Sequence, residues 1–251
     1  MKTKYFLLVL ALLSATCLCH AQEELPTVVA DRPGNTDGSD VMPLHKIGWD
    51  NGFHFESVGD GSHSFTLNST MLRYGIFENV ELRIGTEFLL LNDADPTRLG
   101  IAPLTIGTKI KLYESDSFLP SISVRADFMS PHIGTKELLS AHIGPSLNLI
   151  FEHSIADRFW LCYNAGMDWD GETAEPEKFL AIAFGGDITE ALGAYLETYH
   201  YLHSEDNQHM MELGLTWLAS RRVQLDIEAD FDLMDFGQHY GVGFGVAWLI
   251  N

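Results

Sequence analysis

The sequence predicts an all-β protein, a transmembrane antiparallel up-and-down β-barrel of about 12 strands with both termini in the periplasm. Three observations lead to this prediction. In segments of strand length, apolar side chains alternate with polar ones, which gives each strand one apolar face and one polar face. The connections between these segments alternate between short and long. After residue 21 no apolar run is long enough for a spanning helix, so a membrane protein built from this chain must be a closed barrel.

The alternation is clearest in the last two predicted strands, 223–232 and 239–250. In the first, apolar side chains at odd positions alternate with Gln224 and a run of acids. In the second, large apolar side chains occupy one face, with aromatic residues near both ends, and glycines occupy most of the other. Acids on one strand face require water around them, and aromatic residues near strand ends suit the two membrane interfaces. These strands therefore resemble the closing hairpin of a membrane barrel.

Residues 1–21 have the features of a signal peptide rather than of the fold. Lys2 and Lys4 precede an apolar run too short to span a membrane, and a small-x-small site predicts cleavage after Ala21. Lipidation at Cys17 or Cys19 is the alternative. Cleavage would remove two lysines and no acid, so the formal charge of −20 would become −22. Such an acidic chain argues against nucleic acid as a partner.

Residues 22–46 form a leader in which proline, glycine and aspartate interrupt any strand period. The simpler interpretation is a disordered periplasmic tail. The alternative is a segment inserted into the lumen, where Arg32 would meet an acidic wall. The barrel would then comprise residues 47–251.

Twelve strands are expected after the leader, and no long helical period competes with them. Their ranges are 47–58, 62–75, 80–91, 99–113, 118–130, 140–152, 158–169, 178–188, 192–203, 209–219, 223–232 and 239–250. The second strand does not alternate cleanly, because Phe65, Leu67, Met71 and Arg73 share a parity. We therefore expect a β-bulge or a misjudged register there.

The connections give an independent argument for a membrane barrel. The even-numbered ones are all short, whereas several odd-numbered ones are long and acidic, such as 170–177. Outer-membrane barrels have short periplasmic turns and longer outer loops. A soluble β-sandwich has no reason to alternate in this way.

Short motifs in three places resemble one family of outer-membrane proteins. They are Asp31-Arg32-Pro33-Gly34 in the leader, Leu72-Arg73-Tyr74-Gly75 and Glu81-Leu82-Arg83-Ile84-Gly85. The family is named for a meta-cleavage pathway of phenol degradation and is often labelled "transporter". The resemblance implies an outer-membrane barrel that passes small molecules, with aromatic ones among the candidates, and it supplies no catalytic residues. The chain departs from many such barrels at its C-terminus, which ends Trp248-Leu249-Ile250-Asn251, so recognition by a particular assembly machinery is open.

If the apolar faces meet lipid, a set of charged side chains must line the lumen. The main candidates are Glu81, Arg83, Glu87, Lys109, Arg125, Asp127, Glu197, Glu212, Asp226, Glu228 and Asp230. These charges must be hydrated or paired, because an unpaired charge in a dry interior is very costly. They could border a narrow polar path, or they could form a salt-bridged plug that only maintains the shape of the barrel. A barrel of twelve strands lies between filled and open sizes.

Other candidate chemistry is weaker. Histidines gather near the expected outer rim, but none has a recognised metal-ligand spacing, so we expect neither a metal nor a cofactor. Ser62-His63-Ser64 contains residue types that hydrolases use, yet adjacent strand residues point to opposite faces. We therefore expect no enzyme. Tyr195, Tyr199 and Tyr201 share a strand face with Glu197 and, if inward, could form a sliding surface for aromatic solutes.

The expected function is passive passage of small solutes, aromatic ones among the candidates, through a narrow charged lumen of an outer-membrane channel. A non-conducting structural or surface-binding barrel is the alternative, and a membrane-embedded hydrolase is the third. The expected partners are outer-membrane lipid, a small solute and the outer-membrane assembly machinery.

Overall fold

A computed structural model describes residues 27–58, 61–92, 97–156, 158–204, 207–235 and 237–250. The expected signal peptide, 1–21, and the first residues of the leader lie outside this part of the chain. The strands are β1 (Ile47–Val58), β2 (His63–Phe77), β3 (Val80–Asn92), β4 (Arg98–Ile101), β5 (Thr105–Tyr113), β6 (Ser121–Met129), β7 (Gly144–Ile155), β8 (Phe159–Asp168), β9 (Glu177–Asp187), β10 (Leu192–Leu202), β11 (Asn207–Ser220), β12 (Val223–Asp232) and β13 (His239–Leu249). One short 3₁₀ helix, η1 (Lys136–Leu138), follows β6.

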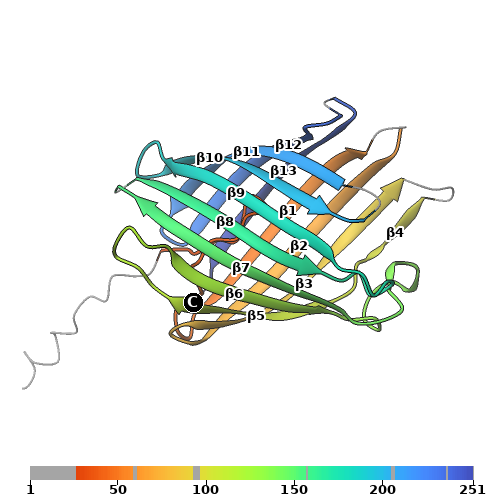
Figure 1. Ribbon diagram of the computed structural model, residues 1–251, viewed down its shortest axis with the longest axis horizontal. Helices are drawn as coiled ribbons and strands as arrows, with labels where there is room; N and C mark the ends of the chain where they lie inside the picture. Colours follow the sequence, from red (N-terminus) through yellow and green to blue (C-terminus); the bar gives the residue numbers. More distant parts are fainter. Residues whose placement is uncertain are drawn as a thin grey trace, which may run out of the picture.

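The strands form a closed antiparallel barrel, as predicted (Figure 1). Closure occurs where β1 pairs with β13 along its length, with Trp49 opposite Trp248 and Phe53 opposite Phe244. The other pairings join strands that follow one another along the chain, with one exception: β3 pairs with β5 as well as with β4. The result is a wall of twelve strands with one extra strand segment.

The extra segment corrects the expectation of one continuous strand over 99–113. The C-terminal part of β3 pairs with β4, where Phe88 lies opposite Ile101. The N-terminal part of β3 pairs with β5, where Gly85 lies opposite Thr105. Pro103 lies between the two segments, where its missing N–H breaks the hydrogen-bond ladder. On its other side β4 is hydrogen-bonded to the loop after β6, since Thr135 N donates to the Ile101 carbonyl.

The irregularity expected in the second strand is a β-bulge, as predicted. The pairing of β2 with β3 shifts by one residue between Thr66 and Asn68, which leaves Leu67 as the extra residue. A one-residue shift moves all later side chains to the opposite face. For this reason Arg73 points into the barrel, where its side chain is fully buried.

The two ends of the barrel differ in their connections. At the short-turn end, β2 and β3 are joined by residues 78–79 and β11 and β12 by 221–222. At the long-loop end, residues 130–143 join β6 to β7 and 169–176 join β8 to β9. This asymmetry follows the pattern of the sequence at most connections, but residues 114–120, which join β5 to β6 at the short-turn end, form a longer connection than expected.

The two faces of the wall have opposite chemistry. On β12, Leu225 and Ile227 point outward with 38% and 52% of their surface exposed, whereas Asp226 and Asp230 point inward and are buried. Strands of this kind hide their charges from the exterior and present hydrocarbon to it. No helix among the described residues is long and apolar enough to cross a membrane.

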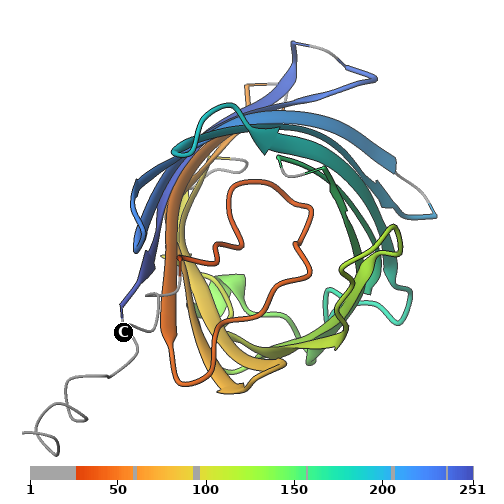
Figure 2. The ribbon, with the colours of Figure 1, turned by 90° about the vertical axis from the view of Figure 1, so that its left-hand side faces the viewer.

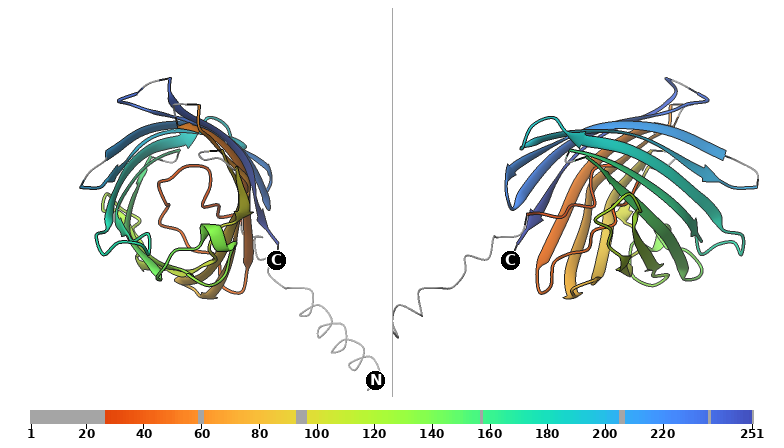
Figure 3. Two further views of the ribbon diagram at one scale, coloured as in Figure 1. Left: turned by 90° about the vertical axis from the view of Figure 1, so that its right-hand side faces the viewer. Right: turned by 60° about the vertical axis from the view of Figure 1, so that its left-hand side comes forward.

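The described part of the leader lies inside the barrel, as the red and orange trace shows in Figure 2 and in the left view of Figure 3. Its contacts reach Glu81 on β3, Glu152 on β7 and Glu212 on β11. The interpretation of the leader as a free tail therefore does not describe this structure. Residues 27–46 are called the docked leader below.

Candidate functional site: a docked leader in a charged lumen

The docked leader meets two parts of the wall that carry opposite charge. The cations of β2, β3, β5 and β6 surround its acidic residues, and these strands are called the basic wall. The acids of β10, β11 and β12 surround its single arginine and its backbone amides, and these strands are called the acidic wall. Apart from Arg73, whose parity is changed by the β2 bulge, both sets belong to the polar faces that sequence alternation assigns to the lumen.

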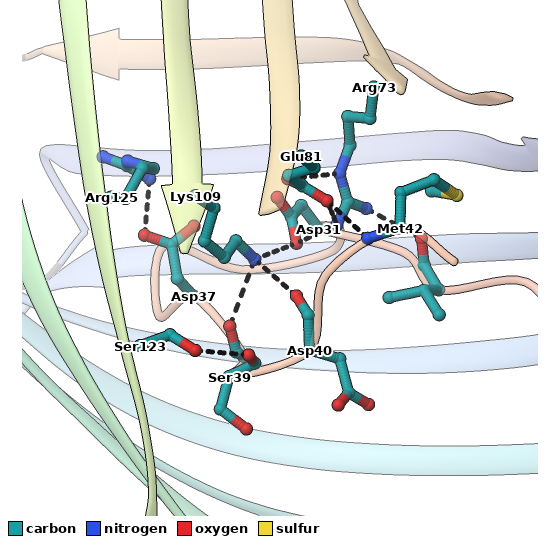
Figure 4. A network of polar contacts seen from close by, with 12 residues as sticks. Asp31, Asp37, Ser39, Asp40, Met42, Arg73, Glu81, Lys109, Ser123 and Arg125 are labelled. Atoms are coloured by element: carbon teal, nitrogen blue, oxygen red, sulfur yellow. Dashed lines mark hydrogen bonds and ion pairs between the residues drawn. The ribbon is translucent and has the colours of Figure 1, made fainter. Parts of the chain in front are cut away.

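Asp31 is the leader residue with the most ion pairs to the basic wall (Figure 4). Its carboxylate lies 2.8 Å from Lys109 Nζ and 3.1 Å from Arg73 Nη2, and it also pairs with Arg83. Burial alone would raise the pKa of Asp31, but the charges of these cations hold it well below its usual range. Asp31 is therefore ionised and bound to three buried cations.

Arg73 and Lys109 are two of the largest fully buried side chains among the described residues. Arg73 donates to both oxygens of Glu81, at 3.0 and 2.9 Å, and its Nη1 donates to the Val29 carbonyl at 2.7 Å. Lys109 Nζ donates to the carbonyls of Gly38 and Asp40 at 3.1 Å each. The two cations thus bind the backbone of the leader as well as its carboxylates, an arrangement that Figure 4 also shows.

Asp37 makes a second anchor at the far side of the basic wall. Its carboxylate pairs with Arg125 and accepts from Asn148 Nδ2 at 2.8 Å. Its carbonyl accepts from Cys162 Sγ at 2.9 Å and from Asn164 Nδ2 at 3.1 Å. Burial opposes ionisation here too, but the charge of Arg125 prevails and the pKa of Asp37 is lowered.

On the acidic wall the leader supplies the donors. Arg32 Nη2 lies 2.8 Å from Asp226 Oδ1 and 3.8 Å from Glu228. The guanidinium loses hydration on burial, yet its bond to Asp226 raises the pKa of Arg32 above its usual value. The backbone amides of Asn35 and Thr36 donate to the two oxygens of Glu197, at 2.7 and 3.0 Å.

Glycines make room for Arg32. Gly52 of β1 and Gly245 of β13 are paired across the closing seam, and a Cβ atom on either would collide with the Arg32 guanidinium. Gly245 also lies directly opposite Asp226 on β12. The inward glycine face of β13 thus leaves room for the Arg32 side chain of the leader to reach the acids of the neighbouring strand β12.

The eleven charged candidates from the sequence all lie on inward faces. Eight of them are among the buried polar residues: Glu81, Arg83, Lys109, Asp127, Glu197, Glu212, Asp226 and Asp230. Glu87, Arg125 and Glu228 line the open cavity described next. Asp31, Arg32 and Gly34 of the leader motif contact the walls directly, and Pro33 lies between them. Sequence reasoning missed the role of Arg73, although the broken parity of β2 was a signal of it.

A cavity of about 800 Å³ lies between the docked leader and the long-loop end. Most of its wall residues come from the halves of the strands nearest that end, such as His54 of β1, Glu87 of β3 and Asp168 of β8. Ten carboxylates and three guanidinium groups line it, a formal excess of seven negative charges. The leader forms the floor through Asp31, Arg32 and Asn35.

A closed barrel with an apolar exterior and a charged, water-accessible interior defines a bacterial outer-membrane β-barrel. The protein is accordingly an outer-membrane protein. The family model described as "Putative MetA-pathway of phenol degradation" matches residues 30–250. The chain belongs to this family, as its short motifs suggested.

Solved outer-membrane channels share the fold. The COG4313 outer membrane channel from Pseudomonas putida F1 is 10% identical, with 87% of this chain and 99% of that chain covered and a TM-score of 0.67. The KdgM porin in complex with disordered oligogalacturonate is 8% identical over 81% of this chain and 99% of that chain, with a TM-score of 0.61. The NanC porin is 11% identical over 80% and 98%, with a TM-score of 0.52. A search of curated proteins gave no match.

Proposed function

We propose that the protein is a passive outer-membrane channel whose lumen, narrowed by the docked leader, admits small cationic and neutral solutes and disfavours anions. The long-loop end faces the cell exterior, and both termini lie in the periplasm. The outer apolar surface contacts lipid after insertion by the outer-membrane assembly machinery. The channel-like fold of the related structures supports passive passage in general terms.

The observation that carries the charge preference is the acidic lining of the cavity. Each of its three guanidinium groups already has a carboxylate partner: Arg32 pairs with Asp226, Arg83 with Asp31 and Arg125 with Asp37. The unneutralised charge of the cavity is therefore negative. A water-filled passage of one sign concentrates counter-ions and repels co-ions.

The density of leader contacts favours a second candidate, a barrel that does not conduct. The leader reaches opposite sides of the lumen, from Lys109 on β5 to Asp226 on β12. A structural role needs no path past these contacts, whereas a channel needs one or needs the leader to move.

Hydrolysis has less support. Histidine pairs with acids occur at the long-loop end, as His54 Nε2 lies 2.8 Å from Asp230 and His239 Nε2 lies 2.7 Å from Glu56. Among the described residues, however, no serine hydroxyl is hydrogen-bonded to a histidine ring. A serine nucleophile would require that contact.

Single-channel recording in planar bilayers tests the proposal. The full mature chain is compared with a variant that lacks residues 27–43, in a KCl gradient. We expect small currents with a reversal potential on the cation side, and larger currents once the leader is deleted. Absence of current from both proteins would support the non-conducting barrel, and an anion-side reversal potential would refute the charge preference.

A further inference from the structure

One side of the 800 Å³ cavity carries most of its apolar and aromatic lining. Phe179 of β9, Tyr199 and Tyr201 of β10 and Met210 of β11 form this side, called the aromatic wall. The residues are true neighbours across the sheet, because Tyr201 pairs with Phe179 and Tyr199 pairs with Met210. Their side chains alternate inward with outward-facing ones such as His200, so they form one continuous surface.

The rings pack against one another and leave one of them more open. The Phe179 and Tyr201 ring centroids are 5.3 Å apart, and those of Tyr199 and Tyr201 are 5.8 Å apart with the planes nearly perpendicular. Phe179 and Tyr199 are only 6% exposed, whereas Tyr201 is half-buried. Tyr201 is therefore the ring most accessible to a molecule in the cavity.

Carboxylates lie on both sides of the aromatic wall along the barrel axis. Toward the long-loop end, Glu177 precedes Phe179 by two residues on the same face of β9, directly opposite Asp168 on β8. Toward the leader, Glu212 follows Met210 by two residues on β11, directly opposite Asp230 on β12. Inward-facing neighbours on a strand are about 7 Å apart, so each acidic row is one step from the rings.

The outer acidic row has no lysine or arginine paired with it, and the base beside it is His203, which lines a neighbouring hollow together with both acids. Like charges directly opposite each other are unfavourable in a sheet, yet Asp168 and Glu177 occupy such a pair. Neither forms an ion pair or a side-chain hydrogen bond with another described residue, and both line the cavity. The arginines of the cavity are already paired with other acids. A cation between the rings and this row would relieve the repulsion.

We propose that the aromatic wall and the Asp168–Glu177 pair form a binding site for an organic ammonium ion that carries an aromatic or similarly flat apolar group. The apolar group packs on Tyr201 and its neighbours, and the ammonium group lies between the two carboxylates and a ring face. An ammonium within about 6 Å of an aromatic centroid is attracted by the ring as well as by the acids. The inference rests on the proposed channel function and names the solute class that would pause in its lumen.

Binding is measured without any need for conduction, by calorimetry on the full mature chain in detergent micelles. The probes are 2-phenylethylammonium, the neutral 2-phenylethanol and the anion 3-phenylpropionate, with n-propylammonium as the cation that lacks a ring. We expect 2-phenylethylammonium to bind roughly tenfold more tightly than either the alcohol or n-propylammonium, the size of effect that a desolvated cation–aromatic contact gives. The anion should bind least.

Matched variants assign the site. Tyr201→Leu should weaken 2-phenylethylammonium binding several-fold, whereas Tyr74→Leu, at an outward-facing tyrosine of β2, should not. Glu177→Gln should lower the preference for the ammonium over the alcohol. Asp187→Asn, at the opposite end of the same strand, should leave that preference unchanged.

The outcomes separate this inference from the proposed function. Equal affinity for the ammonium, the alcohol and the anion in a barrel that conducts would overturn the inference and leave the channel standing. Selective ammonium binding in a barrel that carries no current would support the site and refute the channel. Selective binding that persists in Tyr201→Leu and Glu177→Gln would also overturn the inference, because the ammonium would then bind elsewhere.

Discussion

Asp31→Asn is the sharpest test of what holds the leader in the lumen. The substitution keeps the size of the side chain but removes the one carboxylate that pairs with Lys109 among the described residues, and it leaves that fully buried ammonium without its counter-charge. Removal of one partner from a buried ion pair costs about 3–5 kcal/mol. At about 1.4 kcal/mol per factor of ten, the undocked fraction should increase by a factor between roughly one hundred and several thousand.

Cys162 provides a natural reporter of undocking. It is 2% exposed, its thiol donates to the carbonyl of Asp37, and removal of residues 1–21 would leave it as the sole cysteine. Maleimide labelling should therefore be slow in the wild type and should accelerate in Asp31→Asn in proportion to the undocked fraction.

Asp40→Asn is the matched control for that experiment. Asp40 is on the same leader and makes a 2.8 Å pair with Lys111, but its side chain is 63% exposed. An exposed ion pair contributes at most about 1 kcal/mol, so labelling should change less than about fivefold. If the two variants labelled Cys162 at the same rate, buried ion pairs would not be what secures the leader.

Three further predictions use other contacts. Leu225→Arg should impair assembly, read as heat-modifiable mobility on gels, far more than Gln224→Arg, because an arginine on the lipid face is costly, by up to about 2–4 kcal/mol at the bilayer midplane. Equal effects would contradict the assignment of the two faces. Gly245→Val should displace Arg32 from Asp226 and accelerate Cys162 labelling, and an unchanged rate would show that the seam tolerates a side chain there. Because the pKa values of Asp31 and Asp37 are lowered, their contribution to docking is complete above the ordinary aspartate pKa of about 3.9 and is lost only as pH falls through the lower docked values. A spin label at position 40 should thus keep its mobility from pH 7 to about pH 4.5, and release near pH 6 would contradict this sign.

The wall of the barrel was predictable because alternation is a local property. Residues two apart share a face whatever the rest of the chain does, so Asp226 and Leu225 could be assigned to opposite sides from sequence alone. The ends of the strands and the interruption at Pro103 were harder to predict. A kinked strand and two aligned strand segments have nearly the same composition. The β2 bulge was detectable only as a conflict in parity.

The docking of the leader was not predictable in the same way. Asp31 has no periodic neighbour that indicates its partners, which come from β2, β3 and β5. Only the distribution of charge indicated these partners, because the barrel wall carries cations on early strands and acids on late ones. The inward glycines of β13 were a second hint, since a strand face without side chains leaves room for a visiting group such as Arg32.

The contact of Arg32 with Asp226 spans 194 residues of chain and has a consequence for biogenesis. Arg32 is synthesised early, yet its acceptors Asp226 and Glu228 belong to the last hairpin of the chain. The full set of leader contacts can therefore form only once β12 and β13 are in place and the seam between β1 and β13 closes. Complete docking of the leader thus requires a complete barrel.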